Sequence, residues 1–273
     1  MKFSVTVGAA GPGRDPRGLA ELARVVEGAG WDGLFLEDYL VYQGDASLPT
    51  YDPWICLAAM AMTTERITLG TTVTPLPRRH PWKVAAEVVA LDQLSGGRMI
   101  LGVGSGDPGD PFLERQQPRV LAEMLDEGLE IIDRLWSGQP VTFHGKHYTL
   151  DDAQLTARPV QRPRVPVWVG GNMLVPAVRR RIRRWGGSCA YKGSTDAPQE
   201  ITPDDVRELL AGGAVEVKVS GGDPAAFAAA GGTGGDDGSR QARLRTHWRW
   251  CGKDPRRSEP LTAGRTGERL RVI

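Results

Sequence analysis

Short apolar segments alternate along this chain with longer segments whose apolar residues recur every three or four positions. The short segments predict strands over residues 3–7, 33–37, 67–73, 99–104, 165–170, 188–191 and 215–219. The longer segments predict amphipathic helices over residues 19–30, 53–62, 82–94 and 121–136. A repeat of strand and helix is typical of an α/β fold with mostly parallel strands, and crossovers of one hand can close such a sheet into a (β/α)8 barrel.

The repeat is interrupted once, between the fourth predicted helix and the next strand. Residues 141–150 predict a small β-hairpin that turns at His144, Gly145 and Lys146. Residues 158–166 are rich in proline and predict an extended return segment. We therefore expect an excursion over residues 138–164 near the rim of the barrel.

Composition and charge narrow the class of protein. The chain has 273 residues, of which 40% are hydrophobic and 25% charged, and its net charge is +1. These values are typical of a globular enzyme and give no reason to expect nucleic acid or a membrane as a partner. Cys56, Cys189 and Cys251 lie far apart without metal-ligand spacing, which favours a reduced, cytoplasmic protein. We find no signal-peptide pattern at the start and no run near the roughly 20 apolar residues of a membrane helix.

Two strand ends that contain glycines are candidate ligand sites. Residues 102–107 carry alternate glycines, but the spacing is not GxGxxG and no acidic residue follows where a ribose would be bound. Close approach of a ligand to the backbone explains the same glycines. Gly170, Gly171 and Asn172 end a predicted strand and precede a predicted helix near residue 175. Free N–H groups and the positive end of a helix dipole suit a phosphate, so we assign these three residues to a cofactor phosphate.

Several segments, in this order along the chain, resemble those of the luciferase-like monooxygenase family. They comprise residues 30–38, 70–75, 80–81, 91–98, 102–106, 129–148 and 167–171. Members of this family are flavin- or F420-dependent oxidoreductases with a (β/α)8 barrel of the bacterial luciferase type. The resemblance covers residues 2–231 and implies FMN or coenzyme F420 at the C-terminal mouth of the barrel. It implies oxygenation of a small organic substrate with O2 in the case of FMN, or hydride transfer in the case of F420.

The resemblance also implies roles for residues at the second and third strand ends. Asp38 would bond the cofactor or substrate or take part in proton transfer, with Glu37 in support; the alternative is a local turn cap and a surface ion pair. Thr71, Thr72 and Val73 would lie behind the ring system, with a non-prolyl cis peptide at Thr72–Val73. The acidic Asp38 and the Thr-Thr-Val-Thr-Pro segment that starts at Thr71 favour F420 over FMN.

The remaining implied positions surround the ring. Beside it the resemblance places Gly104, Ser105 and Gly106. For the substrate pocket we propose Tyr39, Tyr42 and His80, although His80 precedes a proline at a helix start and suits a cap or rim position equally well. His144 and His147 lack a third ligand, so we expect no metal site. We also expect a homodimer.

The pattern changes after Gly231. Residues 232–273 are rich in glycine and arginine and show neither strand alternation nor a helical stripe. We therefore divide the chain into a barrel domain, residues 1–231, and an atypical tail, residues 232–273, that is disordered or read out of frame. The eighth strand–helix unit is then incomplete, and the first and seventh strands have open edges.

Two other functions remain open at this point. A catalytically silent barrel would bind a flavin or a metabolite without turnover. A nucleic-acid-associated protein would use the arginines of residues 179–184 together with the tail.

Overall fold

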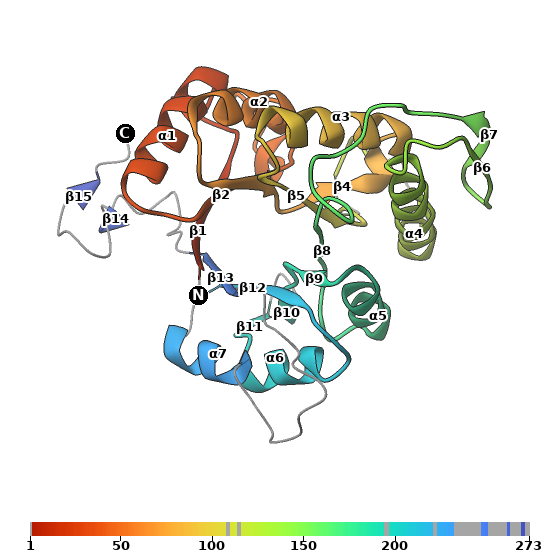
Figure 1. Ribbon diagram of the computed structural model, residues 1–273. Coiled ribbons are helices and arrows are strands. Elements are labelled where there is room, and N and C mark those ends of the chain that lie inside the picture. Colours follow the sequence, from red (N-terminus) through yellow and green to blue (C-terminus); the bar gives the residue numbers. More distant parts are fainter. Residues whose placement is uncertain are drawn as a thin grey trace.

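A closed ring of parallel strands forms the centre of the computed structural model (Figure 1). The structure describes residues 2–107, 110–113, 116–193, 197–220 and 223–231, and the backbone of residues 247–250, 261–262 and 269–270. In ring order the eight strands are β1 (Lys2–Gly8), β2 (Gly33–Glu37), β3 (Thr68–Thr71), β5 (Met99–Gly104), β8 (Val167–Val169), β9 (Gly187–Ser188), β12 (Glu216–Ser220) and β13 (His247–Trp250). The pairing of β3 with β5 closes the ring, which confirms the predicted barrel.

A helix follows each of the first seven strands of the ring. They are α1 (Pro16–Gly28), α2 (Pro53–Thr63), α3 (Pro81–Leu94), α4 (Pro118–Leu135), α5 (Pro176–Trp185), α6 (Pro203–Leu210) and α7 (Pro224–Gly231). Each begins with proline, whose fixed φ and missing N–H suit the first helical position. In Figure 1, α1 to α4 cover one side of the ring and α5 to α7 cover the other. The short α6 and α7 were not among the predicted helices.

Several shorter elements accompany the strands of the ring. The third strand line breaks after Thr71 and resumes as β4 (Thr74–Pro75), which pairs with β5. Two 3-10 turns, η1 (Tyr42–Gly44) and η2 (Leu76–Arg78), follow β2 and β4. Two small antiparallel pairs are β10 (Lys192–Gly193) with β11 (Pro198–Gln199), and β14 (Leu261–Thr262) with β15 (Arg269–Leu270).

The predicted excursion is confirmed as an antiparallel hairpin of β6 (Val141–His144) and β7 (Thr149–Ala153). Glu127 of α4 holds its turn. The Glu127 carboxylate accepts hydrogen bonds from the backbone N–H groups of Lys146, His147 and Tyr148 at 2.8, 2.9 and 3.1 Å. The hairpin is thereby fixed to the outer helix layer.

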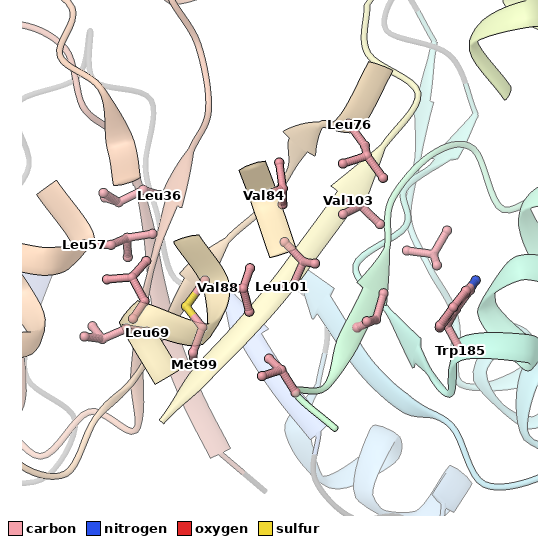
Figure 2. Packing of buried hydrophobic residues seen from close by; sticks show 14 of the residues in the cluster. Leu36, Leu57, Leu69, Leu76, Val84, Val88, Met99, Leu101, Val103 and Trp185 are labelled. Atoms are coloured by element: carbon pink, nitrogen blue, oxygen red, sulfur yellow. The ribbon is translucent and has the colours of Figure 1, made fainter. Parts of the chain in front are cut away.

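The main hydrophobic core lies between the ring and its helices. Strand residues such as Leu36, Leu69 and Leu101 point outward and are at most 1% exposed. They pack against helix residues such as Leu57 of α2 and Val88 of α3 (Figure 2). Alternation along each strand therefore sends one set of side chains to the helices and the other into the ring.

Three buried residues, Phe35, Ile100 and Trp168, form a second cluster that packs together with Cys189. The rings of Phe35 and Trp168 stack with centroids 5.0 Å apart. Glycines accommodate this filling: a Cβ at Gly187 would lie 2.3 Å from Cδ1 of Trp168. At this level the ring is packed with side chains.

The eighth strand corrects one expectation. β13 pairs in parallel with both β1 and β12, so the edges that we expected to be open are paired. No helix follows β13 among the residues that the structure describes. Residues 232–246, 251–260, 263–268 and 271–273 lie outside the described residues, so disorder or a changed frame in the tail stays a prediction.

Two further expected strands are shorter than predicted. The strand predicted over residues 165–170 is limited to the three residues of β8, and the strand predicted over residues 188–191 is the two-residue β9, one position earlier. Pairing with neighbouring strands stabilises both strands. The apolar pattern of the sequence alone therefore predicts their first and last residues poorly. No helix in the described part of the chain combines the length and apolarity needed to span a bilayer.

Candidate functional site

The C-terminal ends of the ring strands, here called the mouth, gather most of the predicted site residues. The peptide bond Thr72–Val73 is cis, as predicted. It lies between β3 and β4, and the Thr72 N–H donates to the carbonyl oxygen of Leu36 in β2 at 2.8 Å. The side chain of Val73 lies between the ends of β5 and β8. A Cβ at Gly104 would lie 2.9 Å, and one at Gly170 2.7 Å, from a Val73 methyl carbon.

The two threonines before Val73 differ in their partners. The Thr71 hydroxyl is buried and donates to the carbonyl oxygen of Gly102 at 2.8 Å. The Thr72 hydroxyl is also buried, but it has no hydrogen-bond partner among the described residues. An unpaired buried hydroxyl costs about 1–3 kcal/mol, so this oxygen is a candidate to bond a ligand at the mouth.

Asp38 lies at the centre of a buried polar network, with a fully enclosed side chain. Its two carboxylate oxygens accept from Trp54 Nε1 at 3.1 Å and the Thr74 hydroxyl at 2.9 Å. They also accept from Arg78 at 2.5 Å and Arg79 at 3.2 Å. With four donors around it and no exposure, Asp38 positions the segment that follows the cis peptide. Its predicted contact with cofactor or substrate stays a prediction.

The same arginines tie this network to other loops at the mouth. Arg78 bonds Asp110 of the loop after β5 at 2.5 Å, and its side chain is only 5% exposed. Arg79 bonds Asp52, the N-cap of α2, at 3.3 Å. Sequence reasoning missed both arginines because their carboxylate partners are distant in the chain.

Glu37 is the less enclosed of the two acidic residues. It accepts a hydrogen bond from the Tyr42 hydroxyl at 2.9 Å, and Tyr42 meets Tyr39 edge to face with ring centroids 5.3 Å apart. Burial raises the pKa of Glu37, although the Tyr42 hydrogen bond and the charge of Lys218 act in the other direction. Burial and the neighbouring Glu37 raise the pKa of Tyr42. The structure thus brings Glu37, Tyr39 and Tyr42 together, and their roles stay predictions.

Lys218 is a buried site residue that sequence reasoning missed. It projects from β12, and its Nζ lies 6.0 Å from the centroid of the Phe35 ring. Burial lowers the pKa of Lys218 and raises the pKa of the neighbouring Cys189 thiol to about 12. The strand alternates valines with Glu216 and Lys218, a signal that could have placed these two charged residues on the inner face.

The proposed phosphate site consists of Gly170, Gly171 and Asn172, between β8 and α5. The Gly170 N–H already donates to the carbonyl oxygen of Val103 at 2.8 Å, and Gly171 has a φ of +119°. Asn172 Oδ1 accepts from the Leu174 N–H at 3.0 Å. Within the described residues, no acceptor bonds the N–H of Gly171 or Asn172. These two N–H groups just before α5 are free to bind an anion, and the phosphate assigned to them stays a prediction.

The other predicted residues lie on the rim. Gly106 has a φ of +89°, and a Cβ there would lie 2.9 Å from the buried Leu113 side chain. Ser105 is half-buried beside it. His80 is exposed at the N-cap of α3, without a side-chain capping bond, and its ring stacks on Trp82 at 4.9 Å. The roles assigned to these residues stay predictions.

Most arginines of α5 already have acidic partners, which weakens the nucleic-acid alternative. Arg179 bonds Glu208, Arg181 bonds Asp126, and Arg184 bonds Glu130. The described residues contain no group of three or more His, Cys, Asp and Glu side chains placed to hold a metal ion.

Comparisons with known proteins give two kinds of relative, F420-dependent dehydrogenases and monooxygenases. The chain is 34% identical over 164 residues to an F420-dependent glucose-6-phosphate dehydrogenase of Microbacterium testaceum, covering 58% of this chain and 47% of that protein. It is 37% identical over 200 residues to a 4-hydroxyprotoasukamycin monooxygenase of Streptomyces nodosus subsp. asukaensis, covering 70% and 52%. The chain therefore spans about half the length of the curated relatives it matches.

Solved structures with a similar fold also include an F420-dependent dehydrogenase and a monooxygenase. An F420-dependent secondary alcohol dehydrogenase in complex with an F420-acetone adduct matches with a TM-score of 0.65 and 20% identity, over 80% of this chain and 68% of that one. The monooxygenase RslO1 from Streptomyces bottropensis matches with a TM-score of 0.62 and 26% identity, over 85% and 67%.

The family assignment follows from a match over most of the chain. The sequence profile of the luciferase-like monooxygenases matches residues 1–250, which includes β13 and extends beyond the limit at Gly231 that we expected. Together with the closed ring, this match shows that the chain belongs to the luciferase-like monooxygenase family.

Proposed function

We propose that this protein is an oxidoreductase that binds a flavin-type cofactor, F420 or FMN, at the mouth and acts on a small organic substrate. The observation that carries the proposal is the buried Thr72 hydroxyl, which has no hydrogen-bond partner among the described residues and lies at the mouth between the ends of β2 and β5. Relatives whose names state dependence on F420 support F420 as the first choice. When bound, F420 would supply hydride transfer, and reduced FMN would supply O2-dependent oxygenation.

The residues at the mouth fit such a cofactor. The N–H groups of Gly171 and Asn172 would hold its phosphate, and the Thr72 hydroxyl would bond the polar edge of its ring. Val73 would support the ring from behind. Asp38 keeps this segment in place through Arg78 and Arg79.

Glu37 is the best placed group for proton transfer. Through the hydrogen bond between Tyr42 and Oε2 of Glu37, a substrate hydroxyl can pass its proton to the Tyr42 oxygen in the same step as the Tyr42 proton passes to Glu37, and the raised pKa of Glu37 favours its role as acceptor. This assigns to Glu37 the role in proton transfer that the sequence favoured for Asp38. The sequence could not show which carboxylate is enclosed.

Binding measurements on the purified chain test the proposal. We expect F420 or FMN to remain bound in equilibrium dialysis, and the bound cofactor to change its absorbance when a substrate is oxidised or oxygenated. Thr72→Val, which replaces only the hydroxyl, should weaken cofactor binding about tenfold. Thr68→Val, at the other end of β3, is the matched control and should leave cofactor binding unchanged. Binding of neither cofactor would overturn the proposal, and binding without turnover of any substrate would favour a silent barrel.

We also propose that two copies of the chain associate through the outward face of α2. Ile55 and Met62 lie seven residues apart on this helix and are 62% and 69% exposed. Large apolar side chains so exposed on one helix face are typical of an interface. Sedimentation velocity should show a dimer for the natural chain and a monomer for Met62→Lys; a monomeric natural chain would contradict this.

A further inference from the structure

Arg14 differs from the other arginines that are buried or half-buried among the described residues. Its Nη1 atom is buried, and no described residue accepts a hydrogen bond from it. The other half-buried arginines each donate to a carboxylate or to backbone carbonyl oxygens; they are Arg78, Arg79, Arg98, Arg164, Arg179 and Arg181. A buried N–H group without an acceptor is costly to remove from water, and an anion would supply the acceptor that Nη1 of Arg14 lacks.

The segment that carries Arg14 is anchored at the mouth. Arg14 lies in the loop between β1 and α1. Its backbone N–H donates to the carbonyl oxygen of Gly11 at 3.2 Å. The loop is fixed to the segment before α2 by a hydrogen bond from the Gly11 N–H to the Pro49 carbonyl oxygen at 2.9 Å. The neighbouring acid, Asp15, is occupied as the N-cap of α1, where it accepts from the Gly18 N–H at 2.8 Å. No ion pair joins Asp15 to Arg14 in the described part of the chain.

Tyr42 connects Arg14 with the proposed proton-transfer residue. Its ring covers the end of β1, since a Cβ at Gly8 would lie 2.2 Å from Cε2 of Tyr42. Arg14 interacts electrostatically with Tyr42, whose hydroxyl bonds Glu37 at 2.9 Å. A ligand held by Arg14 would thus have its other end near Tyr42 and Glu37.

The ring order separates Arg14 from the proposed phosphate site. β1, which precedes Arg14, and β8, which precedes Gly171, are four strands apart in either direction around the ring of eight. The two positions therefore lie on opposite sides of the mouth, with Val73 and the proposed ring site between them. An anion at Arg14 is not the phosphate held at Gly171 and Asn172.

We propose that Arg14 binds an oxyanion of the organic substrate, a carboxylate or a phosphate, and directs the reacting end of that substrate toward Tyr42 and Glu37. This inference deepens the proposed function and rests on it for the identity of the ligand as substrate. A planar guanidinium matches a carboxylate or phosphate through two parallel hydrogen bonds, which a neutral group cannot replace. The substrate class is thereby narrowed to small organic acids and phosphate esters.

The test compares anionic and neutral probes of similar shape on the cofactor-free chain. Benzoate, phenyl phosphate and benzamide are titrated into the full-length protein, with binding followed by calorimetry and by the NMR signal of the Arg14 Nε–H group. We expect at least one of the two anions to bind the natural chain more tightly than benzamide and to shift that signal. Arg14→Gln should weaken the binding of that anion by about tenfold or more. Arg14→Lys keeps the positive charge but cannot form two parallel hydrogen bonds with one anion. It should weaken anion binding by an intermediate factor.

Arg17→Gln is the matched control, because Arg17 is exposed, lies three residues away and carries the same charge. It should change anion binding by less than about twofold. An equal loss in both variants, or no preference of the natural chain for an anion over benzamide, would overturn the inference. The preference of the natural chain decides the question even if Arg14→Gln does not fold.

Cofactor affinity gives an independent outcome. F420 and FMN should bind Arg14→Gln as tightly as the natural chain, whereas a loss of about tenfold would assign Arg14 to the cofactor and overturn the inference. Failure of both cofactors to bind the natural chain would instead overturn the proposed function. These two failures are distinguishable because the probe titrations need no cofactor.

Discussion

Removal of the Asp38 charge should destabilise the fold strongly. Asp38→Asn keeps the size of the side chain but leaves the buried guanidinium groups of Arg78 and Arg79 without their shared carboxylate. Breaking a buried ion pair from one side costs about 3–5 kcal/mol. Because Arg78 keeps Asp110 and Arg79 keeps Asp52, we expect the lower end, about 3 kcal/mol of unfolding free energy.

Urea unfolding followed by tryptophan fluorescence measures this loss, and thermal unfolding should show a midpoint lower by about 6–12 °C. Asp133→Asn is the control, because Asp133 forms a pair with Arg164 at 3.2 Å in which the two side chains are 38% and 32% exposed. Such a pair contributes less than about 1 kcal/mol. If Asp38→Asn cost no more than Asp133→Asn, the network would not hold the segment after the cis peptide as we argue.

The remaining predictions concern Glu37 and the glycines beside Val73. Burial raises the folded-state pKa of Glu37 above its ordinary value of 4.5, so its stabilising contribution is present below about pH 4.5 and is lost as the pH rises through the folded-state pKa. Glu37→Gln should therefore gain unfolding free energy relative to the natural chain as the pH rises from about 4.5 through the folded-state pKa of Glu37, and a difference that does not change with pH would refute this. Gly170→Ala should cost about 1–3 kcal/mol in urea unfolding, because its Cβ would lie 2.7 Å from Val73, and adding Val73→Ala should restore much of that loss. Gly28→Ala, where no atom lies within 4 Å, should cost nothing; additive effects of the Gly170 and Val73 changes would contradict the contact.

The parts of the fold that depend on local pattern could be predicted from the sequence. The four long helices, the hairpin after α4 and most of the ring strands lie where periodicity indicates them. The cis peptide at Thr72–Val73 followed from the family resemblance, since no local property of a threonine–valine pair favours it.

The parts that depend on distant contacts could not be predicted. β13 has only four residues, His247–Trp250, and its pairing with β1 and β12 stabilises it. A short stretch of sequence read by itself does not show such pairing with distant strands. The enclosure of Asp38 likewise depends on Trp54, Arg78 and Arg79 from other segments. Arg14 attracted no attention in the sequence, because only the structure shows that it lacks a partner.

The closure of the ring by β13 has a consequence for synthesis of the protein. β1 leaves the ribosome before the other strands of the ring, yet one of its two neighbours is made more than 230 residues later. Until then a nascent chain has two unpaired strand edges, one on β1 and one on β12, which favour association with other chains. Folding of this barrel is therefore completed only after translation has passed Trp250, and chaperones that shield strand edges would act in that interval.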